Sequence, residues 1–402
     1  MRNLIIGIVV GVVIGVVAGT TVIAPRLELP ATVAAKNTRE QRQEPLERAS
    51  NTAYAPAPTT PKRTALGAPR APVRETTPSP ASAVKWRMAS AFADELPQLG
   101  DMARRIEKRI SAVSNGQFEI KFHNPGTLVP PEEMLEAVRA GAISAAFGTP
   151  ATWGDKKTAF GLFTSIPFGP PPTEYMAWFY GGGGREMLEQ MYRKAGVHGL
   201  ICGALTTEGS GWFKKPIKAV GDFKGLRLAY AGLAGMVMGK LGAQVSTMAL
   251  RDIPTALRSG LIDGAEASQP ALDFGLDLHR VATHYYFPGW HRPVSFLDLV
   301  INFETWEKLT DSQKSQIETV CGDNLRYGIA LSESLQFEAL KRLTAEGVNI
   351  QTWPPEILDA FRAAWRDVVA EQVADNREFK TVWQALTRFR EDYAIWREIS
   401  QP

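Results

Sequence analysis

Residues 115–148, NGQFEIKFHNPGTLVPPEEMLEAVRAGAISAAFG, contain the pattern from which the fold is predicted. Phe118, Ile120 and Phe122 alternate with polar residues, as in a half-buried strand. A Pro-Gly loop follows, and residues 131–140 predict a helix with proline in its first turn. The apolar residues after this helix predict a short buried strand. Strand, helix and strand in this order are typical of an α/β sheet.

The neighbouring sequence continues the alternation. Residues 85–92 (KWRMASAF) have strand character, and Met102, Ile106 and Ile110 recur at helical spacing. Residues 137–147 (AVRAGAISAAF) and 256–266 (ALRSGLIDGAE) share a helix end, an arginine, a glycine cap and a short strand. Two similar halves predict a bilobal fold, although ordinary loop chemistry between a helix and a strand is an alternative reason for so short a match.

Length and charge narrow the class of protein. The chain has 402 residues, which favours two or three structural units. Residues 1–84 carry ten basic and five acidic side chains, which leaves 35 basic and 37 acidic ones in residues 85–402. A nearly neutral body lacks the basic surface of nucleic-acid binders, so we expect no nucleic-acid partner.

Motifs for catalysis and for metal binding are missing from the sequence. No GxSxG, HExxH or GxxxxGK[ST] pattern occurs, and the five histidines lack metal-ligand spacing. The glycines at 181–184 predict a tight turn before a helix rather than a nucleotide loop. Asp263 and Glu266 lie three apart on a predicted strand, so their side chains should face opposite sides. We therefore expect a binding protein with no catalytic residues and no cofactor.

The two cysteines leave two interpretations open. Cys202 and Cys321 are 119 positions apart and belong to no CxxC motif or Cys/His cluster. A single long-range disulfide is one interpretation. Two inert buried thiols are the other, and this is the one we favour from the sequence.

The N-terminal part of the chain is predicted to lie outside the folded body, and the C-terminal part is predicted to be helical. Residues 4–24 hold 21 uncharged residues, long enough to cross a bilayer core of roughly 30 Å, so residues 1–24 predict a membrane anchor or signal segment. An uncleaved anchor in the inner membrane is favoured over a removed signal. Residues 25–84, rich in Pro, Ala and Thr, predict a disordered linker. Residues 351–402 predict long helices whose apolar residues could pack on the chain itself or on a second copy.

A family resemblance rests on several segments taken together. Residues 115–148, the W-F-K-K and D-F-K-G-L-R-L stretch within 212–228, residues 241–268, and W-E-K-L-T at 306–310 resemble the periplasmic solute-binding component of TRAP transporters, the DctP-type family. IPFGPPPTEYMAWFYGGGG (166–184) and YYFPGWH (285–291) most resemble its branch that binds 2-oxo acids with a sodium ion.

The resemblance implies a bilobal type II periplasmic-binding fold with crossing strands, a long hinge-spanning helix and a long C-terminal helix. We place lobe I at residues 85–207 with a later returning segment, lobe II with the crossover segments at 208–350, and the C-terminal helical region at 351–402. The resemblance also implies a periplasmic location, no catalysis and two membrane subunits that receive the ligand. Its 2-oxo-acid branch can dimerise through the C-terminal helix.

The predicted ligand site departs from that family. Most members have an arginine after the K-G-L-[KR]-x run to clamp a ligand carboxylate, and the matching residue here is Ala229. A Gln, a Glu-Trp pair and a second Glu contact the cation and ligand in the 2-oxo-acid branch. Their counterparts here are Glu208, Glu266 with Ala267, and Arg292. A cation beside Arg292 would meet like charge, so we expect no sodium or calcium.

Two hypotheses about the ligand follow. Arg292 could replace the metal, pair with Glu266 or Glu208, and hold a small organic acid. Alternatively, those carboxylates neutralise Arg292, and aromatic and sulfur side chains hold a neutral or lipid-like ligand. A ligand-sensing domain without a transporter is the rival function. The candidate ligand-binding residues are Trp153, Glu208, Trp212, Ala229, Tyr230, Met236, Glu266, Gln269, Trp290, His291 and Arg292.

Overall fold

The computed structural model describes residues 83–153 and 158–400. The predictions of a membrane anchor at residues 1–24 and of a linker at residues 25–84 therefore concern a part of the chain that lies, except for its last two residues, outside the described residues. Within the described ranges, no helix is both long enough and apolar enough to span a bilayer.

The first sheet has the strand order β2-β1-β3-β10-β4. β1 pairs in parallel with β2 and β3, whereas β10 runs antiparallel to β3 and β4. Seven of the eight residues of β10 are buried, as expected for an interior strand covered on both faces. The bounds of these strands are β1 (Val84–Ser90), β2 (Phe118–His123), β3 (Ala145–Gly148), β4 (Val197–Leu205) and β10 (Ser295–Asn302).

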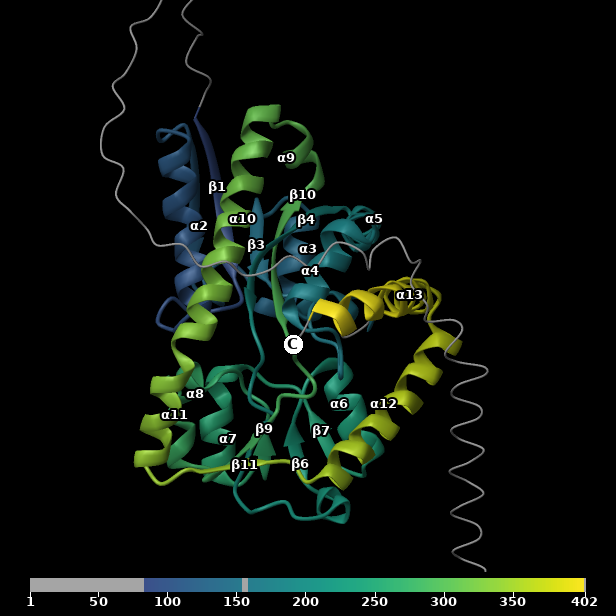
Figure 1. The fold of residues 1–402 in the computed structure, drawn as a ribbon. Coiled ribbons are helices and arrows are strands. Elements are labelled where there is room, and N and C mark those ends of the chain that lie inside the picture. The colour runs from purple at the N-terminus through teal and green to yellow at the C-terminus, as the bar shows by residue number, and fades with distance from the viewer. Residues whose placement is uncertain (1–82, 154–157, 401–402) are drawn as a thin grey trace, which may run out of the picture. The chain divides into compact units, whose positions relative to one another are not determined.

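The second sheet repeats this plan. Its order is β11-β9-β5-β8-β6-β7, with β6 parallel to β7 and β8, and β5 antiparallel to β8 and β9. We call the part of the protein built on the first sheet lobe I and the part built on the second lobe II (Figure 1). The strands are β5 (Gly211–Phe213), β6 (Arg227–Ala229), β7 (Gln244–Ser246), β8 (Gly264–Ala265), β9 (His284–Phe287) and β11 (Asn349–Thr352).

The two similar sequence segments occupy matching places in the two sheets. Gly141 and Gly260 both follow a helix end and have φ values of 72° and 75°, which glycine adopts without strain. The chain then enters β3 in lobe I and β8 in lobe II. β3 is the third strand counted from β2, and β8 is the third counted from β7. Each has an antiparallel neighbour on its other side, β10 for β3 and β5 for β8. The sequence repeat therefore reflects a repeated topology.

Helices cover both sheets. α2 packs on β2 through a face that buries Met102, Ile106 and Ile110, and α10 packs on β4. A capping box between Thr310 and Gln313 begins α10. The helices are α2 (Leu99–Val113), α3 (Met134–Arg139), α4 (Pro172–Gly181), α5 (Gly184–Lys194), α6 (Gly232–Lys240), α7 (Ile253–Ser259), α8 (Pro270–Gly275), α9 (Phe303–Glu307), α10 (Asp311–Ser334), α11 (Gln336–Ala345), α12 (Pro355–Asp375) and α13 (Arg377–Ser400).

A disulfide joins Cys202 on β4 to Cys321 on α10. Our preference for two free thiols was wrong. The two Cα atoms lie 4.1 Å apart because α10 packs directly on β4, a contact that a spacing of 119 residues does not reveal. The bond ties α10, the long helix that leads from lobe I toward lobe II, to β4 at the edge of the first sheet.

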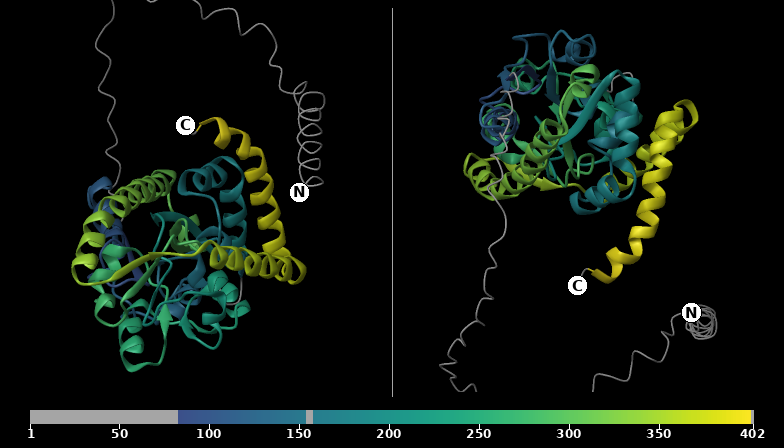
Figure 2. Two further views of the ribbon diagram at one scale, coloured as in Figure 1. Left: turned by 60° about the horizontal axis from the view of Figure 1, so that its bottom comes forward. Right: turned by 90° about the horizontal axis from the view of Figure 1, so that it is seen from above.

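Within the part of the chain that the structure describes, four connections link the lobes. Residues 206–210 lead from β4 to β5, and residues 288–294 lead back from β9 to β10. α10 belongs to lobe I, while α11, directly after it, packs on α8 of lobe II. α12 packs on α6 of lobe II, and α13 packs on α4 and α5 of lobe I. Both views of Figure 2 show α12 and α13 meeting at an angle, with the end of α13 extending beyond its neighbours.

Candidate functional site

The two crossing segments, residues 206–210 and 288–294, bring their polar side chains together between the sheets. Glu208 lies on the first segment and Arg292 on the second, and the backbone N–H of Glu208 donates to the carbonyl of Arg292 at 3.3 Å. Glu266 follows β8, and its own N–H donates to the carbonyl of Ala229 at 3.0 Å. Strand ends and crossing segments thus place these side chains side by side.

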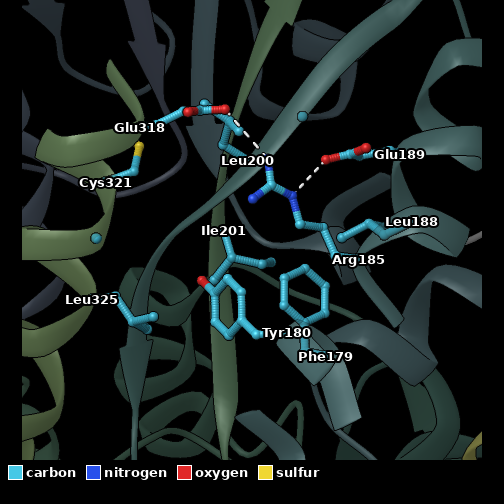
Figure 3. A pocket seen from close by; sticks show the side chains of 12 residues that line it. Phe179, Tyr180, Arg185, Leu188, Glu189, Leu200, Ile201, Glu318, Cys321 and Leu325 are labelled. Carbon is cyan, nitrogen blue, oxygen red and sulfur yellow. Dashed lines mark hydrogen bonds and ion pairs between the residues drawn. The ribbon is translucent and has the colours of Figure 1, made fainter. Parts of the chain in front are cut away.

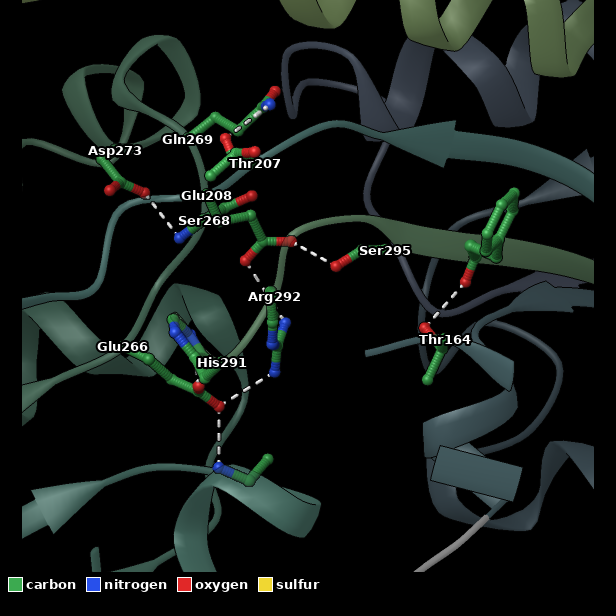
Figure 4. Close-up of polar contacts among 12 residues, drawn as sticks. Thr164, Thr207, Glu208, Glu266, Ser268, Gln269, Asp273, His291, Arg292 and Ser295 are labelled. Atoms are coloured by element: carbon green, nitrogen blue, oxygen red, sulfur yellow. Dashed lines mark hydrogen bonds and ion pairs between the residues drawn. The ribbon is translucent and has the colours of Figure 1, made fainter. Parts of the chain in front are cut away.

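Arg292 contacts both carboxylates. Its Nη2 lies 2.9 Å from Glu266 Oε1, and its Nη1 lies 3.4 Å from Glu208 Oε2. The Ser295 hydroxyl donates to Glu208 Oε1 at 2.6 Å, and the Ala231 N–H donates to Glu266 Oε1 at 2.7 Å. Figure 4 shows the guanidinium between the two carboxylates. We call Glu208, Glu266 and Arg292 the charge cluster.

Burial makes the electrostatics of the cluster strong. Burial raises the pKa of Glu208, and the opposing effects of Arg292 and the Ser295 hydroxyl do not cancel this rise. Burial would also raise the pKa of Glu266, but the positive charge of Arg292 together with His291 and the Ala231 N–H lowers it below its ordinary value. Glu266 is therefore the main ionic partner of Arg292, and Glu208 is the carboxyl that more readily takes up a proton.

The crossing segment that carries Arg292 also presents aromatic nitrogens. Trp290 is buried and stacks between Phe168 and Phe361, with ring centroids 5.5 and 4.5 Å away. His291 is also buried, and its Nε2 lies 2.9 Å from Glu266 Oε2. Among the residues that the structure describes, Trp290 Nε1, His291 Nδ1 and Arg292 Nε have no hydrogen-bond partner. Buried polar groups without partners are uncommon and call for an explanation.

Two sequence candidates have their polar atoms fully engaged elsewhere. The Trp212 indole donates to Asp273 at 2.8 Å and stacks on Tyr285 in the core of lobe II. Gln269 is completely buried, and protein groups occupy both ends of its amide. We remove both residues from the candidate site. The residue types and their positions in the sequence could not show that their polar atoms were already bonded.

The other candidates are more widely placed. The Trp153 indole donates to Asp298 at 2.7 Å inside lobe I, so its polar atom is engaged as that of Trp212 is, and we remove Trp153 from the candidate site as well. Ala229 is buried at the end of β6, and the Tyr230 hydroxyl donates to the carbonyl of Ser210 at 2.7 Å, next to the first crossing segment. Met236 is exposed on α6.

Sequence reasoning missed the neutral partners of the cluster. Ser295 begins β10 immediately after the second crossing segment, and the Ala231 N–H precedes α6. Phe168 and Phe361, which hold Trp290, come from distant parts of the chain. A serine at a strand start carries no distinctive sequence signal, and a backbone N–H carries none at all.

The charge cluster fits a metal ion poorly. A cation here would share both carboxylates with Arg292, and the guanidinium would repel it. Within residues 83–153 and 158–400, no group of three or more His, Cys, Asp or Glu side chains is arranged to hold a metal.

A separate pocket of about 250 Å³ lies in lobe I, away from the crossing segments. α4, α5, β4 and α10 line it with Tyr180, Leu188, Ile201 and Leu325 (Figure 3). Its one arginine, Arg185, is paired with Glu189 and Glu318 at 2.7 and 3.3 Å. The Arg185 and Glu318 side chains are 41% and 44% exposed, so water screens their charges. The charge cluster is largely buried and is therefore the stronger candidate for recognising a charged solute.

The fold is that of a solute-binding protein. The chain belongs to the family described as bacterial extracellular solute-binding protein, family 7 (DctP), whose sequence profile matches residues 88–376. The fold predicted from the sequence, α/β and bilobal of type II, is confirmed.

Three similar proteins illustrate the family. A monocarboxylate 2-oxoacid-binding periplasmic protein of Nostoc sp. is 32% identical over 79% of this chain and 87% of its own length. A TRAP transporter solute-binding protein of Bordetella bronchiseptica, a dimer with copurified calcium and picolinate, is 30% identical with a TM-score of 0.77, covering 79% of this chain and 95% of that one. A TRAP periplasmic solute-binding protein of Pseudoalteromonas atlantica with sodium and pyruvate is 27% identical with a TM-score of 0.75, covering 78% and 95%.

Proposed function

We propose that this protein is the periplasmic solute-binding subunit of a TRAP-type transporter and that it binds a small organic acid without a metal ion. The observation that carries the proposal is the set of buried nitrogens without partners on the second crossing segment, Trp290 Nε1 and Arg292 Nε. A ligand carboxylate beside them would accept the hydrogen bonds that the protein leaves open.

The charge of the cluster supports an acidic ligand. Glu208 has a raised pKa, so it can hold a proton when a second negative charge enters the site. Arg292 then faces one ionised partner, Glu266, and one ligand carboxylate. The guanidinium would then join a protein carboxylate to the carboxylate of the ligand.

A neutral ligand is the second candidate. Arg292 already contacts two carboxylates, and Ala229 supplies only a methyl group where most family members have a clamping arginine. If Glu208 and Glu266 both stay ionised, the cluster repels an acid. Trp290 and Tyr230 would then contact a less polar molecule.

The remaining features follow from the family and the sequence. The ligand-loaded protein would pass its ligand to two membrane subunits without catalysing a reaction, and residues 4–24 would tether it to the inner membrane. Dimerisation would use the end of α13, where Ile395, Trp396 and Ile399 are exposed. A sensing role without transport is separated from this proposal by whether membrane subunits are encoded beside the gene.

Calorimetric titration and thermal shift of the full-length chain in detergent test the ligand class. The panel contains pyruvate, picolinate, pyroglutamate and neutral analogues, each with and without sodium. We expect an acid to raise the midpoint temperature of thermal unfolding by mass action, whether or not sodium is present. Arg292→Ala should weaken its binding by about 2–5 kcal/mol. Binding that requires sodium, or binding of neutral compounds alone, would overturn the proposal.

Arg227→Ala is the matched control for this variant. Arg227 is also an arginine paired with a carboxylate, Asp263 at 2.8 Å, but it lies on the exposed side of β6. Its removal should leave ligand affinity unchanged, because its charge is screened and lies away from the crossing segments.

A further inference from the structure

Gln269, which the ligand site does not use, occupies the place where α8 of lobe II meets lobe I. It is the residue before α8 and is completely buried. Its Oε1 accepts hydrogen bonds from Gln98 Nε2 at 2.8 Å, from the Ser332 hydroxyl at 2.6 Å and from Gln336 Nε2 at 3.1 Å. These donors belong to the start of α2, the end of α10 and the start of α11. One amide oxygen thus contacts both lobes and the helices that link them.

The other end of the same amide holds the first crossing segment. Gln269 Nε2 donates to the carbonyls of Thr206 and Thr207 at 3.1 and 3.2 Å. These carbonyls can only accept hydrogen bonds, so they fix which end of the amide faces them. On the far side of Glu208, the Gly209 N–H donates to the carbonyl of Ser268 at 2.9 Å. Residues 268 and 269 therefore hold the backbone on both sides of Glu208.

We infer that Gln269 is a positioning residue that couples the relative orientation of the two lobes to the placement of Glu208 in the charge cluster. A rotation of lobe II that moves α8 relative to α2 and α10 changes the hydrogen bonds at Oε1. A shift of the same amide displaces the carbonyls of Thr206 and Thr207, to which it donates. Glu208 is the next residue, so its position changes with theirs, and with it the 3.4 Å contact between its carboxylate and Arg292. The binding consequence rests on the proposed function, whereas the effect on lobe orientation does not.

This coupling requires an amide at position 269. A glutamate side chain has the same shape, but its carboxylate has no N–H to donate to the two threonine carbonyls and would face them with negative charge. Gln269→Glu therefore breaks the link to the crossing segment. Asn324→Asp is the matched control, because Asn324 is an equally buried amide on α10 that donates only within lobe I, to the carbonyls of Met102 and Cys202 at 3.2 and 2.7 Å.

The experiment measures the distance between the lobes in the full-length chain without ligand. Spin labels at Lys108→Cys on α2 and Thr255→Cys on α7 report lobe I and lobe II, and both sites are exposed. The two native cysteines are joined in a disulfide, so the added thiols are labelled selectively. We expect Gln269→Glu to shift or broaden the distance distribution. Asn324→Asp should lower the thermal midpoint without changing the distribution.

An unchanged distribution in Gln269→Glu, or the same change in Asn324→Asp, would overturn the inference. If Gln269→Glu does not fold, Gln98→Met removes one direct donor between the lobes and should broaden the same distribution. Pyruvate titration adds a second readout. The apparent affinity for pyruvate should fall roughly tenfold if only a tenth of the molecules keep the lobe orientation that binds ligand. Failure of pyruvate to bind the unmutated chain would count against the proposed ligand class alone, because the distance measurement needs no ligand.

Discussion

Removal of the Arg292 side chain is the perturbation that examines the charge cluster most directly. The guanidinium lies 2.9 Å from Glu266 and 3.4 Å from Glu208, and these carboxylate side chains are only 7% and 2% exposed. Arg292→Ala leaves two buried carboxylates without their cation. Breaking a buried ion pair from one side costs about 3–5 kcal/mol, and we expect the lower end because 23% of the Arg292 side chain is exposed.

This cost should depend on pH in a defined direction. Without Arg292, the pKa values of Glu208 and Glu266 in the folded protein should rise above those of the unfolded chain. Folded protein then binds protons that the unfolded chain has released, so the variant loses stability as pH rises. The difference between the variant and the unmutated protein should be largest above neutral pH and should shrink toward about pH 5.

The assay is urea unfolding followed by tryptophan fluorescence across that pH range. A loss of about 3 kcal/mol corresponds to a fall in thermal midpoint of roughly 6–10 °C. Adding Glu266→Gln to Arg292→Ala should restore part of the stability, because the double variant no longer buries that carboxylate. Arg227→Ala, which removes an exposed pair, should cost less than about 1 kcal/mol. An Arg292→Ala loss no larger than this control, with no dependence on pH, would refute the reasoning.

Three further predictions concern the scaffold. Replacing Cys202 and Cys321 together with alanine should lower the free energy of unfolding by about 4–5 kcal/mol because the bond closes a loop of more than 100 residues; equal urea midpoints with and without reductant would contradict this. Burial raises the pKa of Asp298 to about 7, so stability should fall as pH rises from about 4 to about 7, and Asp298→Asn should remove that slope in urea titrations. Glu174, buried on α4, accepts hydrogen bonds from Arg390 and Arg397, which both lie on α13. Glu174→Leu should therefore speed hydrogen exchange in α13 but not in α2.

The regular parts of the fold could be predicted from the sequence because local patterns determine them. Alternation at 118–122 and helical spacing from Met102 to Ile110 gave β2 and α2, and the glycine caps at 141 and 260 marked equivalent turns in the two lobes. The glycine run at 181–184 also forms the expected turn between α4 and α5. These features depend on neighbouring residues only.

Contacts between distant segments were harder to predict. The disulfide depends on α10 lying on β4, and the saturation of Gln269 depends on four elements meeting at one amide. A sequence pattern ranks a polar residue as a ligand candidate without showing whether another part of the chain already binds it. The structure does place Glu208, Glu266 and Arg292 together, as the pairing hypothesis required.

The elbow between α12 and α13 has a mechanical consequence. Asn376 is the single residue between the helices; its side chain caps α13 through the Phe379 N–H at 3.0 Å and donates to Thr158 of lobe I at 3.2 Å. α12 runs from this fixed point to α6 of lobe II. Because α12 is a continuous helix, it holds a fixed spacing between this junction with lobe I and its contact with α6, so a movement of lobe II relative to lobe I must strain or displace the contacts at one of these two ends.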